Sequence, residues 1–274
     1  MNVDVIKNCA CSQFEQLAKS AIENIKERAG KKGQFLNWIE VLPNNQLKNL
    51  DNMVDLVNKA KGNYTDIAIL GIGGSRHTTE NITKLLGLEA HVHFFSSVEP
   101  ISFERFIKSI NIDKTLFLVV SKSGTTLETT VGYNLARRAI QKHTGNNDTS
   151  SHFVAMTDAN SEKSALRRIV NSGEIKLSGF VHDDVGGRFS IFDDATIFTL
   201  LFLGISKEEI KELLNASLDA QSEFLNSDIE KNEALRLAQF NVKAKNTGKN
   251  KHFVEYFGDM FQGTTLWSGR RSLP

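Results

Sequence analysis

The sequence predicts an α/β fold, a doubly wound parallel five-stranded sheet flanked by helices. Short apolar segments of strand length alternate with longer segments whose apolar residues recur at helical spacing. The strand segments are apolar throughout rather than alternating, which is typical of strands buried on both faces. Two of them lead directly into small polar loops that precede a helical pattern, the arrangement of a βα unit.

The first part of the chain, residues 1–62, is expected to be a helical segment. Apolar residues recur at helical spacing over 12–30, and Gly30 ends that pattern. A second helix is predicted over 46–61, and Gly62 stops it.

Residues 63–205 carry the alternating pattern and are expected to form the sheet domain. The predicted strands are 66–70, 91–95, 116–120, 152–156 and a short last strand at 180–181. The predicted helices start near Thr78 and cover 100–110, 126–143, 161–170 and 195–204. Residues 144–151 are rich in breakers and predict a surface turn.

Residues 206–274 are expected to form a third part. Two helices are predicted over 206–226 and 228–245, followed by a linker at 246–250. Residues 253–257 are expected to begin a new strand.

The segment after the strand at 116–120 is the first candidate site. It reads Ser-Lys-Ser-Gly-Thr-Thr over 121–126, and a helix follows. Free N–H groups and the dipole at a helix N-terminus favour an anion, and hydroxyls add donors without charge. The alternative is an ordinary βα turn capped by a serine or threonine.

Two further loops are expected at the same edge of the sheet. Residues 71–75 follow a strand and read Gly-Ile-Gly-Gly-Ser, which matches neither the dinucleotide fingerprint nor a P-loop. Residues 186–190 read Gly-Gly-Arg-Phe-Ser and bring the guanidinium of Arg188. Beside an anion site it suits a phosphorylated molecule with developing oxyanion character. The alternative is a surface arginine that pairs with Asp183 or Asp184.

Composition narrows the class of protein. The net charge is +1, with 40% hydrophobic and 24% charged residues, so no long-range field favours nucleic acid or an anionic membrane. No apolar run approaches the roughly 20 residues of a membrane span, and the start shows no signal peptide. Cys9 and Cys11 are expected to be reduced thiols, so we expect a cytoplasmic setting. His77 is expected to serve as a helix-start side chain, and His182 and His252 receive no role.

The three loops together resemble the glucose-6-phosphate isomerase family. GIGGS, SKSGTTLET and VGGRFS occur here in the family's order, and the likeness runs from about residue 37 to 261. The first two motifs also mark the wider sugar-isomerase (SIS) domain group. The resemblance implies a flavodoxin-like, three-layer α/β/α SIS domain, with 206–274 as linking helices and the start of an incomplete second SIS domain.

The resemblance also implies roles for individual residues. Gly73, Gly74 and Gly187 would line the substrate, Arg188 would stabilise an enediolate, and Glu128 would orient a later lysine. The residues that would bind the substrate phosphate are Ser75, Ser121, Lys122, Ser123 and Thr126. The implied reaction interconverts glucose 6-phosphate and fructose 6-phosphate through a cis-enediol, in glycolysis and gluconeogenesis. It needs no metal or other cofactor, and the full-length family member would be a homodimer.

One departure from the family concerns the last residues. Residues 257–262 follow the helix that carries the family's glutamate base, but 263–274 do not, and the expected glutamate, histidine and lysine are absent. We therefore expect a truncated or frameshifted chain with little activity of its own. Two alternatives stay open: a non-catalytic SIS module that binds a sugar phosphate in regulation, and another SIS enzyme that acts on amino sugars.

Overall fold

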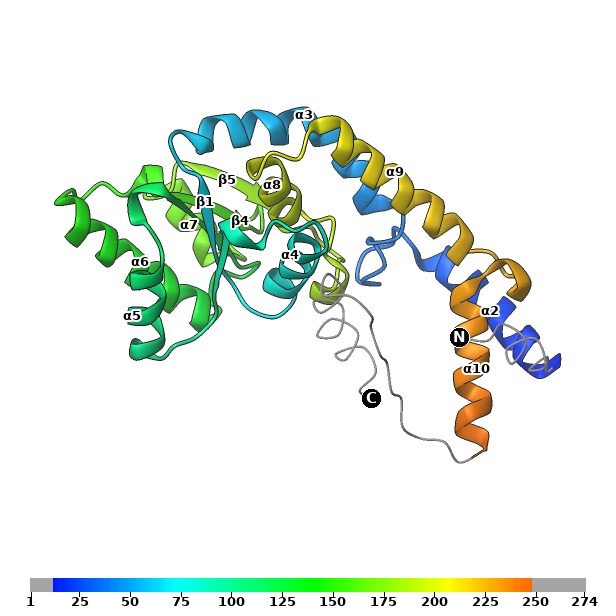
Figure 1. Cartoon of the computed structure of the whole chain (residues 1–274). Coiled ribbons are helices and arrows are strands. Elements are labelled where there is room, and N and C mark those ends of the chain that lie inside the picture. Colours follow the sequence, from blue (N-terminus) through cyan, green and yellow to red (C-terminus); the bar gives the residue numbers. More distant parts are fainter. Residues whose placement is uncertain (1–11, 248–274) are drawn as a thin grey trace.

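The computed structural model describes residues 12–247 and contains a five-stranded, all-parallel sheet (Figure 1). The spatial order is β2-β1-β3-β4-β5. The strands are β1 (Asp66–Leu70), β2 (Val92–Phe95), β3 (Thr115–Val120), β4 (Phe153–Thr157) and β5 (Leu177–Phe180). The predicted fold class is confirmed.

The strand order reverses between β1 and β3. From β1 the chain moves outward to β2, and from β3 it moves the other way through β4 to β5. Leu70 at the end of β1 is paired with Val119 near the end of β3. The loops that follow these two strands therefore start side by side at a topological switch point, where open α/β sheets bind their ligands.

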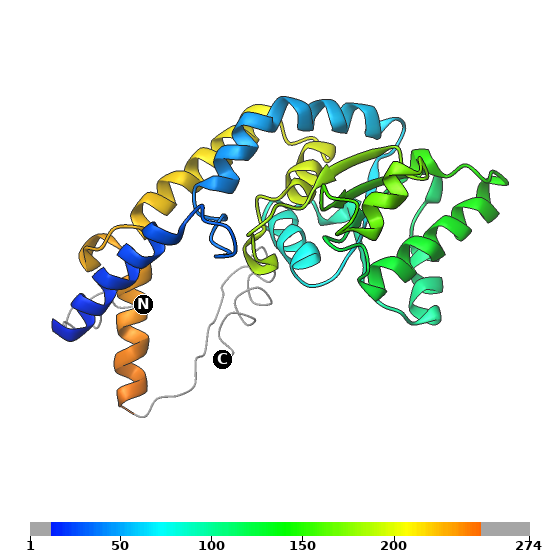
Figure 2. The same ribbon diagram turned by 180° about the vertical axis from the view of Figure 1, so that it is seen from behind.

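Helices cover both faces of the sheet (Figures 1 and 2). One face packs on α3 (Val41–Lys61), α4 (Gly74–Leu85), α8 (Asp194–Phe202) and α9 (Lys207–Phe224). The other packs on α5 (Pro100–Ser109), α6 (Leu127–Thr144) and α7 (Ala165–Asn171). The remaining described helices are α2 (Ser12–Arg28) and α10 (Glu233–Asn246), and five short 3₁₀ turns are Glu89–His91, Ile112–Lys114, Ser150–His152, Gly187–Phe189 and Ile229–Lys231.

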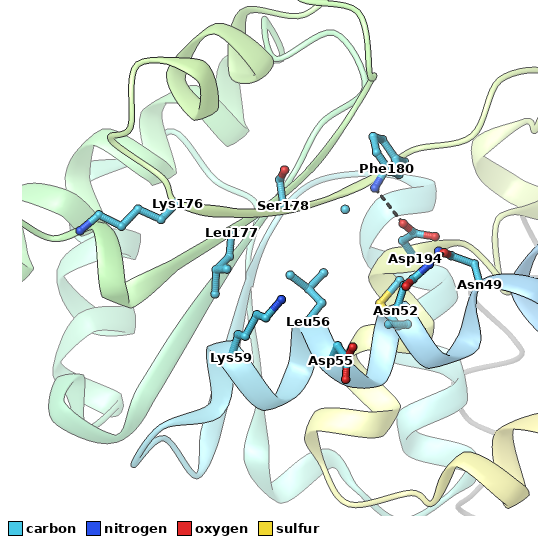
Figure 3. A pocket seen from close by; sticks show the side chains of 12 residues that line it. Asn49, Asn52, Asp55, Leu56, Lys59, Lys176, Leu177, Ser178, Phe180 and Asp194 are labelled. Carbon is cyan, nitrogen blue, oxygen red and sulfur yellow. Dashed lines mark hydrogen bonds between the residues drawn. The ribbon is translucent and has the colours of Figure 1, made fainter.

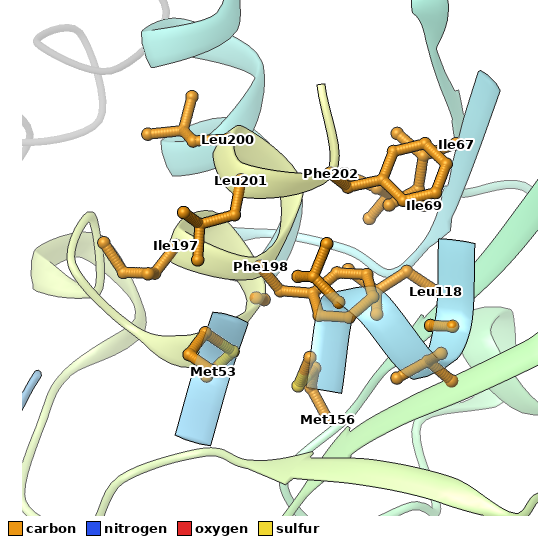
Figure 4. Close-up of a cluster of buried hydrophobic side chains, with 14 of the residues drawn as sticks. Met53, Ile67, Ile69, Leu118, Met156, Ile197, Phe198, Leu200, Leu201 and Phe202 are labelled. Carbon is orange, nitrogen blue, oxygen red and sulfur yellow. The ribbon is translucent and has the colours of Figure 1, made fainter. Parts of the chain in front are cut away.

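The strand residues alternate between two cores. Ile67 and Ile69 of β1 belong to the core beneath α8, whereas Ala68 and Leu70 belong to the core beneath α6. All six residues of β3 are buried, as the apolar sequence predicts. Every residue of α8 is buried, and Phe198 and Phe202 fill the space above β1, β3 and β4 (Figure 4).

The residues before α3 pack onto the segment that follows β5. Leu36 forms an antiparallel bridge with Val185, and the ring of Trp38 stacks on Phe189 with their centroids 4.8 Å apart. The backbone N–H of Gly33 donates to Oδ1 of Asp184 over 2.8 Å. Helices α3 and α9 then run side by side away from the sheet, toward α2 and α10 (Figures 1 and 2).

Several predicted boundaries were wrong. Helix α4 begins at Gly74 rather than near Thr78, and α3 begins at Val41 with Pro43 in its first turn, where a missing N–H costs nothing. Strand β5 lies earlier than predicted. Its sequence, Leu-Ser-Gly-Phe, has no apolar run, so the apolar pattern did not predict a strand there. The helix predicted over 161–170 is the shorter α7.

The end of the predicted surface turn is partly buried. Thr149 and Ser150 are only 4% exposed each.

The helix predicted from 228 begins at Glu233, after the 3₁₀ turn at Ile229–Lys231. The strand predicted at 253–257 lies outside the described residues, as do Cys9 and Cys11. Within the described part of the chain, no helix combines the length and hydropathy that crossing a membrane requires.

Candidate functional site

Three loops meet at the carboxyl ends of the strands. We call them the first loop (residues 71–75, after β1), the second loop (121–126, after β3) and the third loop (186–190, between β5 and α8). Together they surround a cavity of about 130 Å³. Its polar side chains come from Ser75, Thr78, Lys122, Ser190, Asp193 and Thr196. Each of the three loops thus contributes to the lining, and Ser75, Lys122 and Gly187 are the predicted site residues in it. The other predicted site residues are not part of the lining: Gly73, Gly74, Ser121, Ser123, Thr126, Glu128 and Arg188.

The first and third loops touch through their backbones. A Cβ added at Gly74 would lie 1.9 Å from the carbonyl oxygen of Gly187, so only glycine permits this approach. Gly73, just before α4, has a φ of +60°, which is the left-handed region that glycine favours. The glycines of the first motif therefore shape the turn and admit the third loop. Helix α4 can begin at Gly74 because a glycine adopts the helical conformation and, without a Cβ, also lets the backbone of Gly187 pack against it.

The hydroxyls of the second loop bond within the loop itself. Oγ of Ser121 accepts from the N–H of Gly124 over 3.0 Å and lies 3.1 Å from Oγ1 of Thr126. Oγ of Ser123 lies 2.9 Å from Oγ1 of Thr125. Thr126 is the N-cap residue of α6, yet its side chain makes no capping bond. Thr126 therefore does not cap α6 through its side chain, while Oγ of Ser123 accepts from the backbone N–H of Thr125 within the turn over 3.2 Å.

The neighbouring βα unit holds the backbone of the second loop. Oγ1 of Thr157 donates to the carbonyl of Ser121 over 2.7 Å, and the N–H of Ala165 donates to the carbonyl of Ser123 over 2.9 Å. Gly124 has a φ of +66° and packs against Leu166, where a Cβ would lie 2.1 Å from the backbone nitrogen. These contacts turn the carbonyls toward the protein. Glu128 lies in the first turn of α6 and is partly exposed.

The ammonium group of Lys122 reaches the segment before the third loop. Nζ lies 2.8 Å from Oδ1 of Asp183 and donates to the carbonyl of His182 over 3.4 Å. The hydrogen bond from Lys122 holds the pKa of the Asp183 carboxyl below its usual value. The side chain of Lys122 thus joins the second loop to the third.

Arg188 lies in the 3₁₀ turn of the third loop, and its side chain is exposed. The two acidic residues considered as its partners have other contacts. Asp183 pairs with Lys122, and Oδ1 of Asp184 accepts from the N–H of Gly33. Asp184 itself has a φ of +57°, a strained conformation for a residue with a side chain.

A histidine–carboxylate cluster beside the cavity escaped the sequence interpretation. Nδ1 of His182 lies 2.5 Å from Oδ1 of Asp193 and 3.8 Å from Oδ1 of Asp194. Asp194 also accepts from the backbone N–H of Phe180 over 2.8 Å and from Nε2 of Gln46 over 2.7 Å. Burial raises the pKa of Asp194. His182 therefore has partners after all, but they lie eleven and twelve residues further along the chain, which no short motif reveals.

This cluster also has the donor set of a divalent-cation site, since its ligand atoms all lie within 4.8 Å of one another. The contact between His182 and Asp193 is, however, a hydrogen-bond distance. Two ligands held at roughly 2.0–2.2 Å from one ion lie further apart than this. The described atoms already satisfy one another, so an ion-pair network accounts for the cluster.

A larger groove lies on the outer side of β5 (Figure 3). Its volume is about 410 Å³, and it is bounded by α3 and by Leu177–Phe180. Its charged residues are Asp55, Lys59, Lys176 and Asp194, two of each sign. None of the three loops contributes to it. The smaller cavity, where the motifs meet, is therefore the candidate site.

Comparisons with known proteins agree on one family. The family model described as phosphoglucose isomerase matches residues 42–262. The glucose-6-phosphate isomerase of Clostridium novyi is 25% identical over 258 residues, which cover 89% of this chain and 56% of that enzyme. The chain spans about half the length of the curated relatives it matches.

Two solved structures share the fold. A hypothetical protein from Thermus thermophilus has a TM-score of 0.73 and 24% identity, covering 86% of this chain and 54% of that one. A glucose-6-phosphate isomerase from Chlamydia trachomatis has a TM-score of 0.63 and 24% identity, covering 72% and 37%. At this identity the two structures support the fold alone. The family model, in contrast, matches well over half of the sequence, so this chain belongs to the phosphoglucose isomerase family.

Proposed function

We propose that this chain supplies the sugar-phosphate-binding part of an isomerase that interconverts glucose 6-phosphate and fructose 6-phosphate. The observation that carries the proposal is the meeting of the three loops at the switch point of the sheet, with Gly74 packed on Gly187. In this proposal residues 1–62 form a helical segment, 63–205 the SIS domain, and 206–274 the linking helices and the start of a second domain.

The substrate phosphate binds at the first and second loops. Ser75, Ser121, Ser123 and Thr126 supply hydroxyl donors, and Lys122 contributes its backbone N–H, because its ammonium group is engaged with Asp183. The N-terminus of α6 adds free N–H groups and the positive end of its dipole. The hydroxyl pairs seen within the second loop are then exchanged for bonds to phosphate oxygens, which are charged acceptors and form stronger hydrogen bonds.

The third loop faces the sugar rather than the phosphate. Gly187 of this loop and Gly73 and Gly74 of the first loop line the sugar, and the contact of Gly74 with Gly187 brings the two loops together. Arg188 stabilises the oxyanion of the cis-enediolate. Glu128 acts through a lysine outside the matched motifs.

The reaction moves two protons. A carboxylate removes the proton from C2 of the aldose and returns it to C1, while O1 gains a proton and the hydroxyl on C2 loses one, so that the carbonyl shifts from C1 to C2. No net oxidation or reduction occurs. The printed sequence departs from the family pattern after Gln262, where the base is expected. We therefore propose that the 274-residue chain binds the sugar phosphate but turns it over slowly.

The regulatory alternative is less favoured, because the matched curated relatives are isomerases and the third loop brings an arginine suited to an enediolate. We propose that the protein works in the cytoplasm as a homodimer, with a small sugar phosphate as its ligand and without nucleic acid, membrane or cofactor.

Replacement of Thr126 by alanine tests the phosphate site. We expect Thr126→Ala to weaken binding of fructose 6-phosphate by roughly 1 kcal/mol or more, about fivefold, the scale of one hydrogen bond to a charged group. Calorimetry of the 274-residue chain measures this. Thr144→Ala, at the far end of the same helix, is the matched control and should bind as the wild type does. Equal affinity of the Thr126→Ala and wild-type chains would refute the assignment.

A coupled isomerase assay on the purified chain, with Arg188→Ala as the comparison, tests the reaction. Little turnover is expected in either protein. Robust turnover that Arg188→Ala abolishes would mean that a carboxylate in this sequence acts as the base after all.

A further inference from the structure

A hydrogen bond joins the two ends of the segment between β5 and α8, residues 181–193. We call these joined ends the base of the segment. His182 follows β5 by two residues, and Asp193 is the N-cap of α8. The hydrogen bond between Nδ1 of His182 and Oδ1 of Asp193 joins the two ends of the segment across eleven residues. The third loop, with Gly187 and Arg188, lies between them.

The base of the segment is held by several bonds, and its two carboxylates are buried while His182 is partly buried. Oδ1 of Asp193 also accepts from the backbone N–H of Asp194 over 3.1 Å and from that of His182 over 3.4 Å. Asp194 in turn bonds the N–H of Phe180 and the amide of Gln46. Asp193 is 5% and Asp194 1% exposed, so water does not compete well for these bonds.

The same base is connected to the candidate site. Asp193 lines the small cavity together with Ser75 and Gly187. Lys122 of the second loop donates to the carbonyl of His182. His182 therefore connects the second loop to the segment that carries the third loop. If the imidazole of His182 moves, we expect the backbone that leads into the third loop to move with it.

We propose that His182 and Asp193 are positioning residues, whose ion pair closes the base of the segment and sets where Gly187 and Arg188 lie above the first loop. The inference rests on the proposed function, because it assigns to this pair the placement of the loop that contacts the sugar. The proposal assigns neither residue a contact with the substrate phosphate, although Asp193 also lines the small cavity.

The charge on His182 makes the arrangement sensitive to pH. Burial opposes the charge, but the hydrogen bond to Asp193 and the charges of Asp193 and Asp194 outweigh burial and the opposing charge of Lys122, so the pKa of His182 is raised. A raised pKa in the folded state means that the ion pair is fully present below the ordinary histidine value and is lost as the pH rises through the raised one. The third loop is therefore expected to loosen as the pH rises through the raised pKa of His182.

Comparing the affinities of two ligands distinguishes a change in the position of the third loop from a general loss of folded structure. Fructose 6-phosphate contacts all three loops, whereas inorganic phosphate requires only the first and second. The second pKa of a phosphate monoester is about 6, so fructose 6-phosphate keeps one charge state above neutral pH. Inorganic phosphate still loses a proton near neutral pH, so its affinity is expressed for the dianion at each pH. Affinities of the 274-residue chain are measured by titration of its amide resonances, and the ligand-free pH titration of Gly187 is followed in the same experiment.

For the wild type we expect the fructose 6-phosphate affinity to fall about threefold or more as the pH rises through the raised pKa of His182, with little change for the inorganic phosphate dianion. His182→Ala should lower the fructose 6-phosphate affinity about tenfold at pH 7, the effect of losing one buried charge-assisted bond, and should leave inorganic phosphate unaffected. His182→Asn, which restores an amide N–H near the position of Nδ1, should recover most of the affinity without the pH dependence.

Asp193→Asn keeps an N-cap acceptor for α8 and removes only the charge, so it should also abolish the pH dependence. His91→Asn, an exposed histidine at the opposite end of the sheet, is the matched control and should behave as the wild type.

The inference is overturned if His182→Ala weakens both ligands equally, or if wild-type binding and the Gly187 resonance do not depend on pH. A Gly187 resonance that titrates with His182 in a chain that binds no fructose 6-phosphate supports the positioning and refutes the proposed function. Sugar-phosphate binding that is unchanged in His182→Ala leaves the proposed function standing and refutes this inference.

Discussion

The second and third loops of the candidate site are built in different ways. The second loop bonds to itself through serine and threonine hydroxyls, and to the adjacent βα unit through backbone groups. The third loop is anchored by charged side chains and by residues 33–46, about 150 positions earlier in the chain. The hydroxyl bonds of the second loop lie within six consecutive residues, and its backbone is held by the next βα unit along the chain. The third loop, in contrast, is anchored only once parts of the chain about 150 residues apart have come together.

The difference has a functional side. An anion site needs donors in a fixed local geometry, which a loop at a helix N-terminus provides by itself. A group that must lie over the sugar has to be placed relative to another loop, and that placement requires anchors outside its own segment. We therefore expect the third loop to be the more easily disturbed of the two.

The largest effect is expected where the first and third loops touch. Gly74→Ala places a Cβ against the carbonyl of Gly187, a backbone atom that cannot move away cheaply, and we expect a loss of about 3 kcal/mol in the free energy of unfolding. Urea denaturation measures it. Gly186→Ala is the matched control, because Gly186 has a φ of −68° and its Cβ would meet only the ring of Phe189 at 3.4 Å.

The Gly186→Ala protein should be as stable as the wild type or slightly more so. Equal stability of the two variants would mean that the first and third loops do not touch as described.

A smaller effect is expected from the anchors. Asp194→Ala leaves the N–H of Phe180 and the amide of Gln46 without an acceptor, and we expect a loss of about 2–3 kcal/mol in unfolding free energy. Ser121→Ala removes the acceptor for the Gly124 N–H in the second loop and should cost only about 1 kcal/mol. Asp51→Ala, at an exposed carboxylate, is the control.

The order of these losses is the test of the comparison. A greater loss for Ser121→Ala than for Asp194→Ala would show that the second loop, not the third, depends on its buried anchor. Asp51→Ala should stay within about 0.5 kcal/mol of the wild type, the range of exposed ion pairs.

The smallest effect is expected from the link between the two loops. The pair of Lys122 and Asp183 is exposed, with 64% of the Asp183 side chain accessible, so Asp183→Asn should cost no more than about 0.5 kcal/mol near neutral pH. Because the pKa of Asp183 is lowered in the folded state, this contribution is present above the ordinary aspartate value and disappears as the pH falls through the lowered one.

Melting curves of wild-type and Asp183→Asn proteins should therefore converge in acid. A difference that persists below the lowered pKa would mean that the side chain acts through its shape rather than its charge.

Much of the sheet was predictable from local sequence. Strand β1 lies at the predicted residues, and β3 extends its prediction by one, because an all-apolar segment of that length is suited to a strand buried on both faces. Strand β5 was misplaced because it lies at the edge of the sheet, where Ser178 and Gly179 satisfy the packing without an apolar run. The start of α4 was missed because three glycines within five residues predict a loop.

The sequence by itself determined the α/β fold, the hydroxyl pattern of the second loop and the three motifs of the phosphoglucose isomerase family. These features depend on periodicity and on neighbours a few residues apart, so local physical chemistry expresses them. Only the tertiary structure decided that Gly74 meets Gly187, that Lys122 turns to Asp183, and that His182 finds Asp193. Each of these contacts joins residues whose distance in space is unrelated to their separation in sequence, and packing of the whole domain sets it.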